Sequence, residues 1–134
     1  MYDLEDRSEK LGVSKNLLME NAGFSIADGV SKLVGPLTGL KIVSLIGSGN
    51  NGSDGLIASG HLAKWGASVT VIMLKRRPDP DARLQEAIDR GISLVDLSDT
   101  KGKISFSSVE SLLGNAHVIL DGILGIGTDL PVRD

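Results

Sequence analysis

The stretch Leu40–Ile46 reads Leu-Lys-Ile-Val-Ser-Leu-Ile, and Gly47–Gly55 follows it directly as Gly-Ser-Gly-Asn-Asn-Gly-Ser-Asp-Gly. The first stretch is a short apolar run, which is typical of a strand buried on both faces. The second is polar and glycine-rich, and residues 56–65 then show helical apolar spacing that ends at Gly66. A buried strand, a glycine-rich loop and a helix in this order predict an α/β fold with a parallel sheet.

The alternation of strands and helices continues on both sides of this junction. The apolar spacing predicts helices at 14–34, 79–91 and 107–113 and strands at 67–74, 92–97 and 116–120. Ser14, Asp79 and Ser107 are the expected N-caps, with Pro80 as the first helical residue after Asp79 and Ser107 paired with Glu110 in a capping box. Each predicted strand is thus followed by a helix, except the last.

This order of elements predicts a Rossmann-like, three-layer α/β/α fold with a doubly wound parallel sheet. The commonest strand order for such chains is 3-2-1-4, in which the first and fourth strands are neighbours and ligands bind at their carboxyl ends. We therefore expect residues 47–55 and 121–131 to line one cleft. Sheets of this kind usually continue, so we expect this one to be incomplete at the C-terminus, where the chain ends at Asp134.

Composition excludes several classes of protein. The net charge of −3 and the small number of aromatic residues (1 Trp, 1 Tyr and 2 Phe) argue against nucleic acid as a partner. Cysteine is absent, which excludes disulfides and a thiolate nucleophile. No apolar run approaches the roughly 18 residues of a membrane helix, and the charged start is unlike a secretory signal. We expect a cytoplasmic protein that does not associate with membranes.

The glycine-rich segment fits the pattern G-x-G-x-x-G between a strand and a helix, which is the position of a phosphate-binding loop. The alternative is a tight turn that needs positive φ angles. Two features differ from ordinary NAD sites: the loop carries Asn50, Asn51 and Asp54, and the strand at 67–74 ends without a ribose-binding acid. It ends instead in the basic run 75–77, which we interpret as a solvated turn; the alternative is a site for a phosphorylated ribose.

Asn50, Asn51, Asp54 and Asp121 bring carbonyl and carboxylate oxygens to the predicted cleft. Oxygen donors of this kind suit hard cations. The alternatives are local: Asp121 as a cap on the following turn and Asp54 as a helix N-cap. His61 and His117 lack metal-ligand spacing and are interpreted as packing or surface residues.

Three motifs occur in one order along the chain: Leu18-Met19-Glu20-Asn21-Ala22-Gly23, then Gly47–Gly55, then Asp121-Gly122-Ile123-Leu124-Gly125-Ile126-Gly127. They resemble the NAD(P)H-hydrate epimerase family, also called the YjeF N-terminal domain, with small departures at Ser53, Gly122 and Ile126. The resemblance implies a Rossmann-like fold and a nicotinamide-nucleotide repair activity, the interconversion of the R and S forms of hydrated NADH and NADPH at C6. A dehydratase acting on one form then restores the cofactor.

The resemblance also implies roles for particular residues. Potassium is the implied metal cofactor, with Asn51 and Asp121 as its ligands. The resemblance does not identify the residue that moves the proton, and our candidate for the catalytic residue is Asp121. The substrate-binding residues that it implies are Asn50, Asn51, Gly52, Ser53, Asp54, Gly125, Ile126, Gly127, Thr128, Asp129, Leu130 and Pro131. The family continues to a V-D-x-P-S-G segment, so the resemblance covers residues 1–134 as a truncated epimerase domain that is expected to be inactive alone.

The resemblance also implies partners. The expected partners are hydrated NADH or NADPH, a dehydratase domain that is fused or separate, and a second copy in a homodimer. One alternative is a non-catalytic nucleotide-binding or dimerisation module with the same fold. Another is an NADP-dependent oxidoreductase, against which the missing ribose acid and the asparagine-rich loop weigh.

Overall fold

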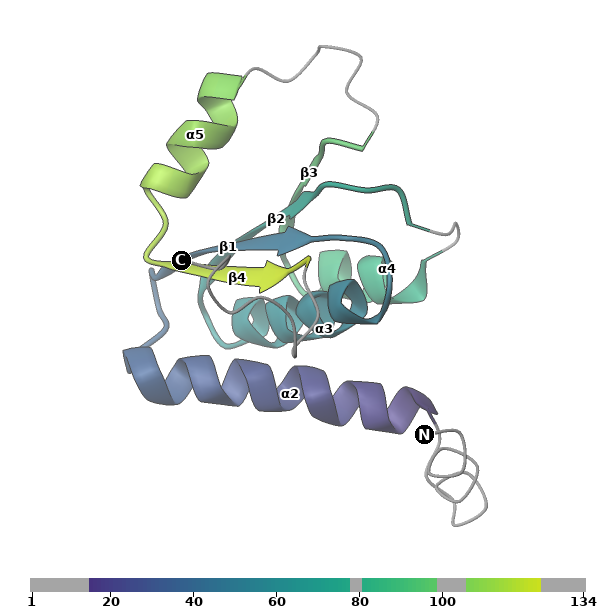
Figure 1. Cartoon of the computed structure of the whole chain (residues 1–134). Helices are drawn as coiled ribbons and strands as arrows, with labels where there is room; N and C mark the ends of the chain where they lie inside the picture. Colours follow the sequence, from purple (N-terminus) through teal and green to yellow (C-terminus); the bar gives the residue numbers. More distant parts are fainter. Residues whose placement is uncertain (1–14, 78–80, 99–105, 124–134) are drawn as a thin grey trace, which may run out of the picture.

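The computed structural model describes residues 15–77, 81–98 and 106–123 (Figure 1). The elements in chain order are α2 (Lys15–Val34), β1 (Lys41–Ile46), α3 (Asn50–Lys64), β2 (Ser68–Met73), α4 (Ala82–Asp89), β3 (Ser93–Asp96), α5 (Phe106–Gly114) and β4 (Val118–Gly122). The strands form one parallel sheet. The predicted α/β class is therefore confirmed.

The strand order is β3-β2-β1-β4, as the doubly wound topology predicts. β1 pairs with β2 on one side and with β4 on the other, so that Leu45 lies opposite Asp121 and Ile46 opposite Met73. The carboxyl ends of β1 and β4 are thus neighbours at one edge of the sheet. This is where ligands bind in sheets whose winding reverses.

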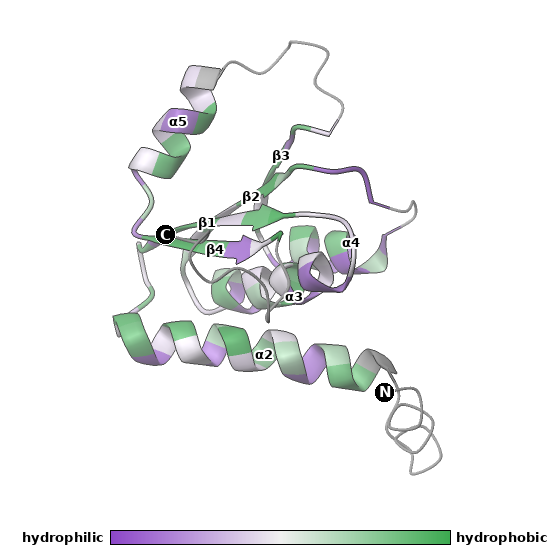
Figure 2. Cartoon of the chain, viewed as in Figure 1, coloured by the Kyte–Doolittle hydropathy of each residue, from purple (hydrophilic) through white to green (hydrophobic). Residues whose placement is uncertain are grey.

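Helices cover both faces of the sheet: α2, α3 and α4 lie on one side and α5 on the other (Figure 1). The core lies between α3 and β1, where Ile42, Ile46, Leu56 and Leu62 are fully buried. Burying each such side chain contributes about 1.5–3 kcal/mol. In Figure 2 the central strands are mostly hydrophobic, whereas the segment that follows β2 is hydrophilic.

Glycine and serine allow α3 to approach its neighbours closely. A Cβ at Gly23 of α2 would lie 2.3 Å from Ile57 Cγ2, so α2 packs on α3 through a position without a side chain. Ser44 of β1 and Ser59 of α3 are fully buried, with 2.6 Å between their Oγ atoms. Ser59 donates to the Gly55 carbonyl at 2.7 Å, which satisfies the polar pair inside the core.

The other face of the sheet is covered more thinly. A hollow of about 230 Å³ separates α5 from β1 and β2, lined among others by Val43, Thr70 and Leu112. Ile119, which pairs with Val43 and so shares its face, is 50% exposed. Among the described residues, no helix is both long enough and apolar enough to span a membrane.

Three predicted helix boundaries were wrong. α3 begins at Asn50, because residues 50–55 form its first turns where the glycine content predicts a loop. α4 is capped by Asp81, whose carboxylate accepts from the Arg83 and Leu84 amides, whereas Asp79 and Pro80 lie outside the described residues. α5 begins at Phe106, which places Ser107 inside the helix. α2 ends at Val34, before the positive φ of Gly35, as predicted.

Candidate functional site

The junction between β1 and α3 is a tight turn followed at once by helix. Gly49 adopts a φ of 107°, a left-handed value that only glycine reaches without strain. The Ser53 amide donates to the Gly49 carbonyl at 3.1 Å and begins the helical hydrogen bonding. The Gly47 amide donates to the Gly122 carbonyl at 3.3 Å and ties the turn to the end of β4. The amino end of α3 therefore lies at the carboxyl ends of β1 and β4, where the winding of the sheet reverses.

A small pocket of about 130 Å³ lies at this edge. The residues that line it are Gly47, Ser48, Gly49, Asn50, Asn51, Gly52, Lys75, Gly122 and Ile123. They come from the turn after β1, from the segment after β2 and from the end of β4. The expectation that residues 47–55 and 121–131 line one cleft is confirmed for 47–52, Gly122 and Ile123, whereas residues 53–55 and Asp121 do not line this pocket.

Two glycines bring main-chain segments together here. A Cβ at Gly52 would lie 2.3 Å from the Gly47 carbonyl oxygen, a distance that no side chain tolerates. A Cβ at Gly122 would lie 3.0 Å from the Leu45 carbonyl oxygen and 3.2 Å from that of Asn51. The main chain of Asn51 therefore lies beside Gly122, the residue that follows Asp121. Sequence motifs far apart in the chain meet at this point.

The side chain of Arg77 is only 6% exposed and stabilises the turn after β1 through hydrogen bonds. Its Nη1 donates to the carbonyls of Gly47 at 3.0 Å and Gly49 at 3.3 Å, and its Nη2 donates to Ser53 Oγ at 2.6 Å. Its Nε pairs with Asp81 Oδ2 at 2.5 Å. The prediction that residues 75–77 form a solvated turn is therefore wrong for Arg77.

The sequence analysis missed Arg77, although a signal was present. Arg77 follows the strand that neighbours β1 in the predicted order, so it lies at the same sheet edge as the glycine turn. Asp81, the N-cap of α4, stands four residues further on in the sequence and supplies the carboxylate that pairs with Arg77. An arginine just beyond a strand and near a glycine turn can donate to the main-chain carbonyls of that turn.

The residues predicted to bind substrate separate into three groups. Asn50, Asn51 and Gly52 line the pocket. Ser53 and Asp54 do not line it: Ser53 is buried and accepts from Arg77, and Asp54 is half-buried on the first turns of α3. Burial raises the pKa of the Asp54 carboxyl above its ordinary value. Gly125, Ile126, Gly127, Thr128, Asp129, Leu130 and Pro131 lie outside the described residues.

Asp121 lies in β4, next to the pocket-lining Gly122. Its side chain is exposed, and Oδ1 accepts from the Ile123 amide at 2.9 Å, which is the local turn-capping role considered as an alternative. This contact uses one oxygen of a group that has two. Capping the turn and facing a ligand are therefore compatible.

The two histidines have structural roles, as interpreted. His61 packs edge-on against Phe24, with 5.4 Å between ring centroids, and lies beside Trp65. Burial, together with the charge of Arg90, lowers the pKa of His61. The Nδ1 atom of His117 accepts from the Lys41 amide at 2.8 Å. Within residues 15–77, 81–98 and 106–123, no three His, Cys, Asp or Glu side chains gather as a metal site.

Comparisons with known proteins identify the family of this chain. The model of the family "YjeF-related protein N-terminus" matches residues 15–134. A bifunctional NAD(P)H-hydrate repair enzyme Nnr from Hyperthermus butylicus is 37% identical over 92% of this chain and 22% of its own length. An NAD(P)H-hydrate epimerase from Nitrosopumilus maritimus is 31% identical over 100% of this chain and 60% of its own length.

A solved structure shows the same fold. The crystal structure of the yeast protein ynu0 (YNL200c) has a TM-score of 0.69, with 23% sequence identity, over 99% of this chain and 58% of that chain. The chain thus spans little more than half of that structure's length and at most 60% of the two curated relatives described above. The family model, however, covers all three motifs around which the site is built. The chain belongs to the YjeF-related N-terminal domain family.

Proposed function

We propose that this chain forms part of an enzyme of nicotinamide-nucleotide repair, an epimerase that interconverts the R and S forms of hydrated NADH or NADPH at C6. Relatives from archaea and fungi are named NAD(P)H-hydrate epimerase and match 92 to 100% of this chain. A dehydratase, fused to the domain or separate, would consume one epimer. The bifunctional names of other relatives support such a fusion.

One observation carries the proposal. The glycine turn and the end of β4 form one pocket, in which Asn50 and Asn51 stand at the amino end of α3 and Asp121 lies one residue from the lining residue Gly122. Amide groups at a helix amino terminus, with a carboxylate one residue before the lining glycine of the neighbouring strand, suit a polar, phosphate-bearing ligand and a cation. A scaffold without a ligand has no need of this set of oxygens.

The residues present fit potassium as a cofactor. The amide oxygen of Asn51 and the carboxylate of Asp121 are hard donors from segments that the structure brings together at Gly122. We propose that these two residues hold the ion, which when bound would supply a fixed positive charge beside the substrate. Asn50 and the turn amides would orient the substrate, and Arg77 would keep the turn in place.

Epimerisation at a carbon atom requires a bond at that carbon to break and form again, with transfer of a proton. Asp121 is the carboxylate nearest the pocket along the chain, and as a metal ligand it would be ionised and act electrostatically. Ser53 and Asp54 would contribute indirectly: Ser53 through Arg77, and Asp54 from the first turns of α3.

An epimerisation assay tests the proposal. The full-length gene product is given purified R-form NADPH hydrate in potassium or choline chloride of equal ionic strength, and the S form is followed by chromatography. We expect potassium-dependent conversion that is lost in Asp121→Asn and retained in Asp89→Asn. Asp89 is a matched control, because it is an exposed carboxylate on α4 that accepts a hydrogen bond from Gln85. Absence of conversion by folded wild-type protein would refute the epimerase function.

A further inference from the structure

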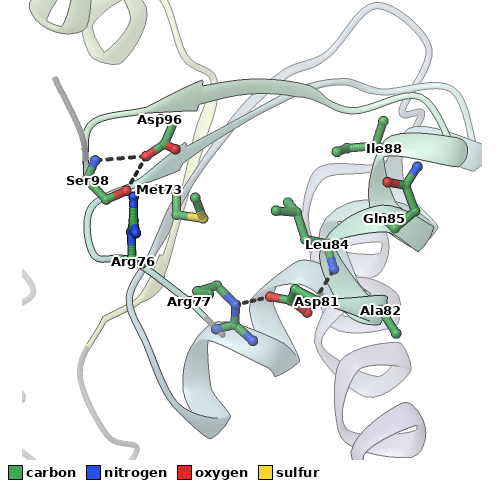
Figure 3. A pocket seen from close by; sticks show the side chains of 10 residues that line it. All are labelled: Met73, Arg76, Arg77, Asp81, Ala82, Leu84, Gln85, Ile88, Asp96 and Ser98. Carbon is green, nitrogen blue, oxygen red and sulfur yellow. Dashed lines mark hydrogen bonds and ion pairs between the residues drawn. The ribbon is translucent and has the colours of Figure 1, made fainter. Parts of the chain in front are cut away.

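A second, larger pocket lies beside the glycine turn, between the ends of β2 and β3 and helix α4 (Figure 3). Its volume is about 650 Å³, a size typical of small-molecule sites. Its lining residues are Met73, Arg76, Arg77, Asp81, Ala82, Leu84, Gln85, Ile88, Asp96 and Ser98. The function proposed above uses none of this space.

The floor of this second pocket is apolar. The side chains of Met73, Leu84 and Ile88 turn toward the same space from β2 and α4 (Figure 3). Met73 is 6% exposed, whereas Ile88 is 38% exposed although it is a large aliphatic residue. A thioether and two aliphatic groups around an open space suit a flat heteroaromatic ring, which buries its faces on such side chains.

The rim of the second pocket contains an acidic residue, Asp96, that could take the place of the ribose-binding acid missing from the end of β2. The register of β2 and β3 places Asp96 directly beside Met73, on the same face of the sheet. Asp96 Oδ1 accepts from the Ser98 amide at 2.8 Å and from Ser98 Oγ at 2.5 Å, which orients the carboxylate. A carboxylate so oriented retains acceptor capacity on its other oxygen for the hydroxyl groups of a ribose.

The two pockets lie on either side of one short segment. Lys75 lines the pocket at the glycine turn, whereas Arg76 and Arg77 line the larger one. Arg77 also donates to the Gly47 carbonyl, so its side chain forms part of the wall between the pockets. Lys75 and Arg76 bring positive charge to this boundary, which suits the phosphates that join the two halves of a dinucleotide.

We propose that the larger pocket binds the nucleoside at the far end of the dinucleotide, with an adenine-type base over Met73, Leu84 and Ile88 and its ribose toward Asp96. The pocket at the glycine turn then receives the hydrated nicotinamide half. This inference rests on the proposed function. It makes Asp96 and Ile88 determinants of affinity for the whole dinucleotide, remote from the reacting carbon.

Two variants of the full-length protein test the proposal. Ile88→Glu places a carboxylate in the base site from a partly exposed position, and Asp96→Asn removes the charge at the ribose site. Leu33→Glu is the matched control, because Leu33 of α2 is 87% exposed and lies outside both pockets. We expect both test variants to bind ADP-ribose about ten-fold more weakly than wild type in calorimetric titration, and the control to bind equally. Wild-type protein that does not bind ADP-ribose, or variants that bind it equally, would overturn the proposal.

A pair of substrates separates this inference from the proposed function. The hydrates of NADH and of reduced nicotinamide mononucleotide share the reacting ring, but only the first has the distal nucleoside. Ile88→Glu should raise KM about ten-fold for the dinucleotide hydrate and leave kcat/KM for the mononucleotide hydrate unchanged. Equal losses on both substrates would contradict the pocket assignment. If wild type converts neither hydrate, the proposed function fails, and the ADP-ribose titration alone decides the pocket.

Discussion

The two chain segments that meet at the candidate site are held in opposite ways. The turn after β1 is tightly packed: Gly52 is in contact with the Gly47 carbonyl, and the buried Arg77 holds two carbonyls of the turn. At the end of β4, Asp121 is exposed and its carboxylate accepts from the Ile123 amide. The first segment is therefore part of the folded framework, whereas the second presents its charged group to solvent. Substitutions in the first should cost mainly stability, and those at Asp121 mainly activity.

The largest expected loss of stability is that of Arg77→Gln. The change removes the guanidinium from beside the Asp81 carboxylate, which is 12% exposed, and leaves the carbonyls of Gly47 and Gly49 without that donor. We expect the free energy of unfolding in urea to fall by about 3 kcal/mol. The neighbouring Arg76→Gln is the control, with an expected change within about 0.5 kcal/mol because its side chain is exposed. Equal effects of the two variants would show that the contacts of Arg77 do not stabilise the turn after β1, and the contrast between this turn and the end of β4 would be lost.

Gly52→Ala should have the next largest effect. The added methyl group would lie 2.3 Å from a main-chain oxygen and 2.5 Å from Arg77 Nη1, so the turn must shift. We expect a loss of about 2 kcal/mol in urea unfolding, typical of overpacking. Gly29→Ala in α2 is the matched control, because no atom lies within 4 Å of its added Cβ. That control should gain up to about 1 kcal/mol through helix propensity, and a loss as large as that of Gly52→Ala would show that packing at the turn is not the cause.

Asp54→Asn should have a smaller effect that depends on pH. Burial raises the pKa of Asp54 in the folded protein above the ordinary 3.8, so the folded state binds its proton more tightly than the unfolded state. The contribution of Asp54 to the free energy of unfolding therefore falls as pH rises from about 3.8 through the raised pKa. The Asp54→Asn variant has no group that titrates at this position, so it lacks this decline. Urea unfolding from pH 4 to pH 7 should show the variant gaining on wild type as pH rises. A difference that is constant with pH would contradict the burial of the charged group.

The smallest effect on stability is expected for Asp121→Asn. The side chain is exposed, and an amide oxygen can accept from the Ile123 amide as the carboxylate does at 2.9 Å. We expect the free energy of unfolding to change by less than about 0.5 kcal/mol, while the epimerisation proposed above is lost. A loss of stability as large as that of Arg77→Gln would show that the end of β4 belongs to the framework after all.

Much of the fold could be predicted from local pattern. The apolar run at 40–46, the β-branched run at 67–74 and the helical spacing between them are sufficient for a parallel α/β sheet, because burial on both faces requires such runs. The boundaries of α3 and α4 were less predictable. Asn50–Gly55 looks like a loop in sequence, yet it is helical and close packing requires glycine at position 52, where a Cβ would lie 2.3 Å from the Gly47 carbonyl oxygen.

The candidate site likewise has a part that could be predicted from the sequence and a part that could not. The sequence by itself predicted that Asn50, Asn51 and Asp121 belong to segments at the carboxyl ends of neighbouring strands, because the commonest strand order for this alternation of elements makes the first and fourth strands neighbours. Only the tertiary structure decided that Arg77 is buried beneath the turn and that Asp96 stands beside Met73. The reason is physical: an exposed basic residue and a buried one look alike in sequence, and only the register and packing of separate strands bring a guanidinium to carbonyls or a carboxylate to the edge of a pocket.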